Sequence, residues 1–276
     1  MSRVLRCYGV TVGGVMDARY IAHLQRAFSR ERLMSYRPAG GDDVETAANY
    51  LWNIALCEAL YPTLQVIEVA LRNSMHNAAS ALLGTPYWFD PPFMNGPKRT
   101  LQRDQVAAAR ENWSKNERRK HPRGSVLPPA TPGQLVAELM FGFWTGLMNR
   151  PFITPFWPAA PTANNPGILA AVFPHVPTRY RSREPLFHRF ERIRILRNRV
   201  FHYEHVWDWR QPPLGWQPAV TNIAQQHAEA IEALRWISPV AADTLQLIDR
   251  FPTVYVQRRA YYRRNLDAVL RLAGTL

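Results

Sequence analysis

Apolar residues recur every three or four positions through most of this 276-residue chain, and no long stretch alternates apolar with polar residues. A period near 3.6 is that of an amphipathic helix, whereas a half-buried strand alternates with period two. The sequence therefore predicts an all-α fold without a sheet. With 47% hydrophobic residues, the chain can bury a substantial core. We expect one domain over 1–276, with a core at about 17–210 and a helical extension at about 217–276.

Capping residues and prolines divide this pattern into separate helices. Pro62 is expected to end one helix, whereas Thr131-Pro132 and Ser238-Pro239 each supply a hydroxyl cap followed by proline at the first helical position. The proline-rich segment 85–97 is expected to be a structured loop, and 151–166 to wrap the surface. The expected helices cover 17–33, 42–62 with an aspartate cap, 64–83, 98–123, 131–149, 167–173, a helix from about 183, 221–237, 238–250 and 255–272.

The chain is strongly basic, with a formal net charge of +13 from 34 Lys+Arg against 21 Asp+Glu. Such a charge attracts polyanions, which include nucleic acid and acidic membrane. Most of the excess is Arg, whose guanidinium binds phosphates in bidentate fashion and stacks on bases, and this favours nucleic acid. Segment 98–123 has nine Lys/Arg against three acids. It is either a solvated helix with a basic loop or a track for an RNA backbone.

The sequence lacks the motifs of several common functional classes. There is no Walker A loop, dinucleotide-binding glycine motif, H-E-x-x-H or G-x-S-x-G. Two cysteines, Cys7 and Cys57, are too few for a four-ligand zinc cluster, and the histidines lack metal-ligand spacing. We therefore expect no metal and no cofactor. No apolar run approaches the ~20 residues of a membrane span, and no signal-peptide core is present. We expect a cytoplasmic protein without a membrane partner.

Segment 193–207, which reads I-R-I-L-R-N-R-V-F-H-Y-E-H-V-W, holds the strongest functional signal. On a helix, Arg194, Asn198 and His202 are four residues apart and share one face. Arg197 instead has apolar helical neighbours, so its guanidinium needs a partner. That partner is either a carboxylate within the protein or the phosphate of a ligand.

A second polar row consists of Glu68, Arg72 and His76, spaced by four residues, and Asn73 lies directly after Arg72. One reading is a surface ion pair between Glu68 and Arg72 that supports its helix. The other places this face against the helix of Arg197, with Glu68 as its carboxylate or Arg72 as a second phosphate ligand.

Aromatic residues follow the Arg197 helix. Tyr203, Trp207 and Trp209 either stack on bases or pack beside the helix end. His205 either assists catalysis or is an exposed bystander. Phe143 and Trp144, by contrast, lie within an apolar helical pattern and are predicted to be core residues.

Arg197 and His202 form R-x4-H with Asn198 directly after the arginine, which resembles the HEPN superfamily. Four segments in the same order, 60–74, 87–89, 138–147 and 193–204, resemble the abortive-infection (Abi) proteins of that superfamily. The resemblance implies a HEPN-like helical bundle with additional helices and long Pro/aromatic-rich loops. It implies a metal-independent endoribonuclease in phage defence, or a toxin, with RNA as substrate. It also implies a homodimer with a composite active site, controlled by an antitoxin or a phage-derived trigger.

The resemblance also assigns roles to residues. His202 is the acid/base, Arg197 stabilises charge on the phosphoryl oxygens, and Asn198 orients His202 or the phosphate. An imidazole titrates near neutral pH, so it can move protons to or from RNA oxygens, giving a 2′,3′-cyclic phosphate and a 5′-OH. Supporting residues are Glu68, Arg72, Asn73, Arg194, Arg199 and Tyr203. The alternatives are a non-catalytic RNA-binding or sensing component of a defence system, or an interaction module that regulates another effector.

One position departs from the pattern of some HEPN toxins, which carry R-x4-H-x-Y with a tyrosine that a partner enzyme modifies. Glu204 occupies that position here, and Tyr203 directly follows His202. We therefore do not expect that control. Arg197 and His202 are five residues apart, ~140° around a straight helix. One helix alone would not complete the site, so a second copy is expected to face it.

Overall fold

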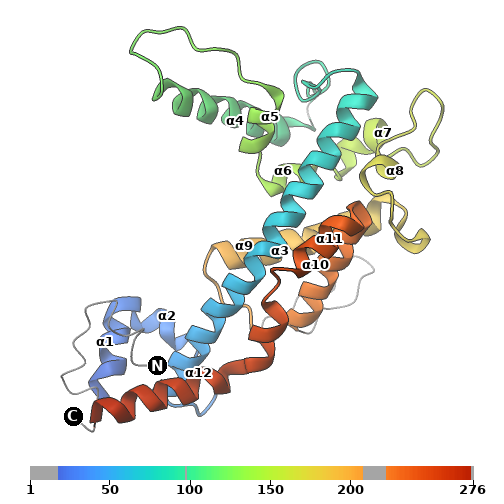
Figure 1. Ribbon diagram of the computed structural model, residues 1–276. Coiled ribbons are helices and arrows are strands. Elements are labelled where there is room, and N and C mark those ends of the chain that lie inside the picture. The colour runs from blue at the N-terminus through green and yellow to red at the C-terminus, as the bar shows by residue number, and fades with distance from the viewer. Residues whose placement is uncertain (1–17, 97, 208–221, 275–276) are drawn as a thin grey trace. The chain divides into compact units, whose positions relative to one another are not determined.

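The computed structural model describes residues 18–96, 98–207 and 222–274, and within these ranges the chain forms helices and turns without a strand (Figure 1). The all-α prediction is confirmed for these residues. Backbone contacts divide the chain into two compact units. The first unit comprises Met1–Leu60, Arg199–Trp209 and Arg250–Leu276, and the second comprises Tyr61–Asn198 and Arg210–Asp249. Each unit combines segments of the expected core and of the expected C-terminal extension.

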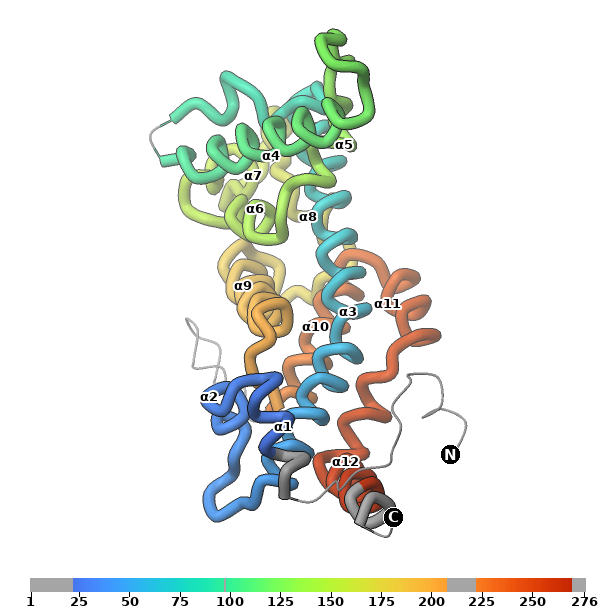
Figure 2. Tube along the Cα trace, turned by 90° about the vertical axis from the view of Figure 1, so that its left-hand side faces the viewer, coloured from blue at the N-terminus to red at the C-terminus, as the bar shows by residue number. Residues whose placement is uncertain are grey.

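The first unit contains α1 (Ala18–Phe28), α2 (Arg30–Met34), the beginning of α3 (Asp43–Leu83), the end of α9 (Arg183–Phe201) and α12 (Phe251–Gly274). Figure 2 shows α1, α2 and α12 around the N-terminal part of α3. Ala47 and Ala48 of α3 pack with Leu266 of α12 in a small core. These alanines allow close approach of the helices, because they carry no larger side chain.

The single helix expected at 17–33 is wrong, because Ser29 separates α1 from α2. Ser29 has φ 60, and its side chain accepts a hydrogen bond from the N–H of Arg32. A residue with positive φ cannot continue a right-handed helix, whereas a serine hydroxyl can cap a new one. Asp42 caps α3 as predicted, since its Oδ1 lies 2.6 Å from the backbone nitrogen of Glu45. This bond, together with the side chain of Arg263, lowers the pKa of Asp42.

The break expected at Pro62 is also wrong, because α3 continues through it from Asp43 to Leu83. Proline lacks the N–H that would bond the carbonyl of Glu58, a cost of ~3 kcal/mol in a helix interior. Leu60 and Leu64 on either side are both almost completely buried. Burying two leucine side chains contributes an amount comparable to that cost, so the helix persists.

Helix α3 is also long and apolar enough to cross a membrane, by length and composition only. From the sequence we expected no apolar run that approaches the ~20 residues of a membrane span. Core helices of globular proteins pass the same test. Within the first unit, Asn49 and Asn53 of α3 are buried and hydrogen-bonded to Tyr36.

The second unit gathers its short helices around the C-terminal part of α3, as both views show for α4 to α8 (Figures 1 and 2). Helices α10 and α11 pack on each other, and α11 begins at the predicted Ser238 cap, which bonds the N–H of Ala241. The elements of this unit, besides parts of α3 and α9, are α4 (Thr100–Arg118), α5 (Pro132–Glu138), α6 (Phe141–Gly146), η2 (Arg150–Phe152), α7 (Ile153–Phe156), α8 (Leu169–Val172), η3 (Thr178–Tyr180), α10 (Ile223–Ile237) and α11 (Pro239–Gln246).

The helix expected at 131–149 is two helices. Its start is as predicted, because Thr131 and Gln134 form a capping box. At Leu139 the backbone becomes extended, with ψ 121, and its carbonyl accepts the indole N–H of Trp144 at 3.3 Å. The buried Trp144 thus bonds a carbonyl that a continuous helix would have used, and a new helix begins at Phe141.

Aromatic side chains form the core of the second unit. Trp88 lies within 5.5–6.3 Å, between ring centroids, of five other rings. These are Phe89, Phe93, Phe143, Trp144 and Phe156. The loop at 85–96 is non-helical as predicted, and it carries Trp88 into the core. Phe143 and Trp144 are core residues, as predicted. The expectation that 151–166 wraps the surface is wrong for Phe152 and Phe156, which are fully buried.

Candidate functional site

Helix α9 ends in a Schellman motif that fixes the backbone around His202. The N–H of Glu204 donates to the carbonyl of Arg199 at 3.0 Å, and the N–H of Tyr203 donates to that of Val200 at 3.2 Å. These are the two bonds that define the motif, and they make His202 the C-cap residue of α9. Tyr203 has φ 59, the left-handed conformation that this position requires. His202 itself is exposed.

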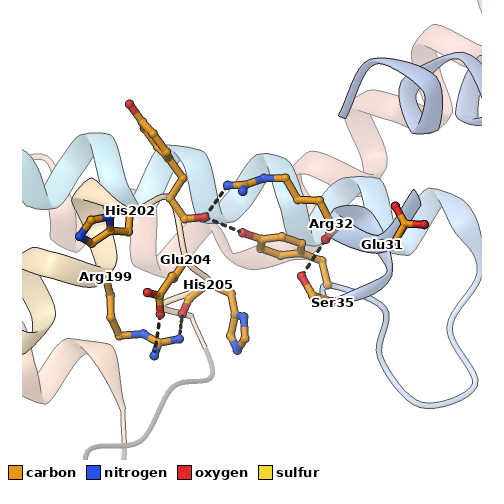
Figure 3. Close-up of a pocket in the computed structure, with 9 residues that line it drawn as sticks. Glu31, Arg32, Ser35, Arg199, His202, Glu204 and His205 are labelled. Carbon is orange, nitrogen blue, oxygen red and sulfur yellow. Dashed lines mark hydrogen bonds and ion pairs between the residues drawn. The ribbon is translucent and has the colours of Figure 1, made fainter. Parts of the chain in front are cut away.

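His202 lines a hollow of about 330 Å³ in the first unit (Figure 3). The wall opposite the end of α9 comes from α2 and the turn after it. Nη2 of Arg32 donates to the carbonyl of Tyr203 at 2.5 Å, and the hydroxyl of Tyr36 donates to the same oxygen at 3.4 Å. The residues around the hollow are Glu31, Arg32, Ser35, Tyr36, Arg199, His202, Tyr203, Glu204 and His205.

The segment after α9 is held by two side chains from different parts of the chain. Nη1 of Arg199 lies 2.9 Å from a carboxylate oxygen of Glu204, and Nη2 donates to the carbonyl of His205 at 3.0 Å. The amide of Asn53, on α3, donates to the carbonyl of Glu204 and accepts from the N–H of Val206 at 2.7 Å. Arg199 was expected to support substrate binding, and here it ties down the backbone.

Burial raises the pKa of Tyr36 to about 12. A tyrosine hydroxyl is protonated at neutral pH in any case, and here it donates to the carbonyl of Tyr203. It also accepts from the amide of Asn53 at 3.3 Å. Tyr36 thus connects α3 to the turn that presents His202.

In the second unit, Arg197 faces Glu68 of α3. Nε of Arg197 lies 3.4 Å from Oε2 of Glu68, and their side chains are only 22% and 18% exposed. Of the two partners considered for Arg197, an internal carboxylate and a ligand phosphate, the structure contains the first. Arg72 lies one turn further along α3 and forms no ion pair with Glu68 among the described contacts. Its Nε is buried without a hydrogen-bond partner.

The remaining members of the polar rows differ in their surroundings. Arg194 is paired within α9 with Glu191 through two contacts, one of 2.8 Å, and this raises the pKa of Arg194. Asn73 is exposed and Asn198 is half-buried. Neither asparagine makes a side-chain hydrogen bond within the described part of the chain.

His76 has a structural role, because its Nδ1 accepts a hydrogen bond from the indole of Trp88 at 3.1 Å. Burial lowers the pKa of His76, which keeps the acceptor nitrogen unprotonated.

The aromatic residues after α9 also separate into two kinds. Trp207 packs against Trp52 with ring centroids 6.1 Å apart, so its role is packing. The ring of His205 lies 6.0 Å from that of Tyr36 in a T-shaped contact, so it is not an exposed bystander. Tyr203, in contrast, is 72% exposed. Trp209 lies outside the described residues.

Part of the positive charge in 98–123 is paired locally. Arg110 pairs with Asp90, Lys115 with Glu111 at 2.7 Å, and Lys120 with Glu117 at 2.9 Å. Two of these pairs use glutamates within the segment, so its net positive charge is little changed, and both readings stay open.

Among the described residues, no three or more His, Cys, Asp or Glu side chains gather as they would around a metal ion. No protein-family model, curated protein or solved structure matches this chain. The resemblance to HEPN and Abi proteins therefore stays a prediction from the sequence motifs.

Proposed function

We propose that this chain is a HEPN-type, metal-independent endoribonuclease that acts in phage defence or as a toxin. The observation that carries the proposal is the placement of His202. It is exposed at the C-cap of α9 and lines a hollow that also contains Arg32. An imidazole that performs acid/base chemistry must reach a substrate, and a cation beside it favours a phosphate.

The proposed reaction needs no group beyond the chain and RNA. His202 accepts the proton of a ribose 2′-OH while that oxygen bonds to the adjacent phosphorus. The bond from phosphorus to the 5′-oxygen breaks, and that oxygen takes a proton from a second acid or from water. The products are a 2′,3′-cyclic phosphate and a 5′-OH. Arg197 stabilises the negative charge on the phosphoryl oxygens, and Asn198 orients the phosphate or His202.

The proposal includes a homodimer with composite sites. The Glu68 carboxylate neutralises the charge of the Arg197 guanidinium. It also orients that guanidinium, because the five N–H donors form a rigid fork. Arg197 and His202 are ~140° apart around a straight helix, and a second copy would supply the missing half of each site. An antitoxin or a phage-derived trigger would control the activity.

The test is incubation of the purified protein with total RNA in EDTA, followed by mapping of the cleaved ends. Wild type is expected to leave 2′,3′-cyclic phosphates. His202→Ala should lose about 100-fold or more, which is the usual contribution of a general acid or base. His175→Ala removes another exposed imidazole, with no side-chain contact described, and should cleave like wild type. A wild-type protein that cuts no RNA under any of these conditions would refute the proposal.

A second candidate is a non-catalytic RNA-binding or sensing protein. The ion pair between Arg197 and Glu68 favours this second candidate, because the pair gives Arg197 a structural role within the fold. This alternative predicts that wild type binds RNA with a steep salt dependence and leaves it intact. Cleavage by wild type that is lost in His202→Ala, with binding retained, excludes it.

A further inference from the structure

Tyr203 occupies a position where stability alone would favour another residue. It takes the C′ place of a Schellman motif with φ 59, where glycine is the usual residue because it lacks the Cβ that makes this conformation strained. The residue is 72% exposed, and its side chain makes no hydrogen bond or ring contact within the described part of the chain. Neither backbone conformation nor packing therefore explains a tyrosine here.

The backbone of Tyr203 is nevertheless held firmly. Its N–H bonds the end of α9, and its carbonyl accepts hydrogen bonds from both Arg32 and Tyr36. The direction in which Cβ leaves the chain is therefore set before any ligand arrives. A tyrosine side chain has two χ angles, so little conformational entropy remains to be lost when its ring binds something.

The hollow is lined by two arginines and two glutamates, so with neutral histidines its formal net charge is zero, and the case for a phosphate rests on Arg32. Of its two arginines, Arg199 is paired with the carboxylate of Glu204, whereas Arg32 contacts a backbone carbonyl. The structure gives Arg32 no carboxylate partner among the described residues. Figure 3 shows Arg32 coming from α2 and His202 at the end of α9, and of these two only Arg32 has a described hydrogen bond to the Tyr203 carbonyl.

We propose that the ring of Tyr203 is a stacking platform for one base of single-stranded RNA, with Arg32 as the ligand of a neighbouring phosphate. Every base has a π-face, so such a platform binds RNA without reading its sequence. The inference rests on the proposed function for the identity of the ligand, and it names how the His202 site holds its substrate. A stacked base beside His202 would fix the attached ribose near the imidazole.

The test measures binding of a fluorescent 2′-O-methyl oligonucleotide by anisotropy. This probe lacks the 2′-OH nucleophile and cannot be cleaved by the proposed route, so binding is separated from catalysis. Tyr203→Phe keeps the ring and should bind like wild type. Tyr203→Gly should weaken binding by about 5-fold to 150-fold, the loss expected for one stacked base. Its melting temperature should equal or exceed that of wild type, because glycine relieves the strain at φ 59.

Arg32 is tested with the same probe over a series of salt concentrations. Arg32→Gln should reduce the slope of log affinity against log salt by about 1, the signature of one lost phosphate contact. Arg150→Gln removes an exposed arginine of the second unit and should leave the slope unchanged.

Three outcomes would overturn the inference: Tyr203→Gly that binds like wild type, Tyr203→Gly that melts well below wild type, or Tyr203→Phe that binds as poorly as Tyr203→Gly. A low melting temperature for Tyr203→Gly would show that the ring stabilises the fold. Poor binding by Tyr203→Phe would show that the contact with RNA depends on the hydroxyl and not on stacking. If the protein cuts no RNA but its RNA binding depends on Tyr203, the stacking proposal stands. That outcome would refute only the proposal that the protein is an endoribonuclease.

Discussion

Removing the carboxylate of Glu68 should destabilise the second unit, because the partly buried Arg197 guanidinium loses the attraction of this charge. At the observed 3.4 Å, the attraction between the two charges is about 5 kcal/mol at an effective dielectric constant of 20, and about 1 kcal/mol in water. Side-chain exposures of 22% and 18% place the pair between these limits. The cost of removing both charges from water offsets part of the attraction. We therefore expect a coupling of about 1–2 kcal/mol.

A double-mutant cycle measures that coupling. The variants are Glu68→Gln, which keeps the shape, and Arg197→Met, which keeps the aliphatic stem. The free energy of unfolding in urea would be compared for wild type, both single variants and the double variant. The exposed pair Glu111 and Lys115 is the control, with an expected coupling of about 0.3–0.5 kcal/mol for an i,i+4 pair.

A coupling between Glu68 and Arg197 no larger than that of the control pair would refute the reasoning. The same variants separate structure from chemistry. If Arg197 contributes only through its pairing, both single variants should cleave RNA equally well when folded. If Arg197 stabilises the transition state, Arg197→Met should lose far more cleavage than Glu68→Gln.

Three further predictions concern other parts of the fold. Asn53→Ala removes the amide that bonds two backbone groups after α9, and should cost about 2–4 kcal/mol in urea unfolding; a loss below 1 kcal/mol would contradict this. Thr131→Ala removes the capping box of α5 and should cost about 1 kcal/mol, whereas Thr131→Ser should cost little. Burial lowers the pKa of His227 below 6.5 although Asp249 lies 3.2 Å away and opposes the shift. The unfolded chain then binds the proton more readily, so stability should fall as pH is lowered below about 6.5, and His227→Gln should flatten this dependence.

Local features of the fold were predictable because their causes are local. Asp42, Thr131 and Ser238 cap helices as predicted, since an N-cap bonds an N–H only three residues away. The errors have non-local causes. Pro62 does not end α3, because burial on both sides of it compensates the lost hydrogen bond. The break at Leu139 depends on the indole of Trp144 reaching its carbonyl.

Part of the site was predictable, because a charged side chain in apolar surroundings needs a partner of opposite charge. Arg197 in apolar surroundings needed an anionic partner, either a carboxylate or a phosphate, and Glu68 in the second polar row was one of the candidates; the structure pairs the two. Arg32, Tyr36 and Asn53 were missed because each lies more than 150 residues from the segment that it contacts. Nothing in the sequence around these three residues indicates that contact.

The two residues of R-x4-H belong to different compact units, and each is held by its own neighbours: Arg197 by Glu68, and His202 by the backbone motif at the end of α9. The composite dimer that we propose can therefore be tested by complementation. Arg197→Ala and His202→Ala copies carrying different tags are co-expressed, and the mixed dimer is purified through both tags. If each site takes Arg197 from one copy and His202 from the other, one site combines both lesions and the second is intact. The mixed dimer should then cleave RNA at about half the wild-type rate, although each variant alone is inactive. A mixed dimer without activity would show that both residues must come from the same copy, and a protein that stays monomeric while cutting RNA would rule out the composite site.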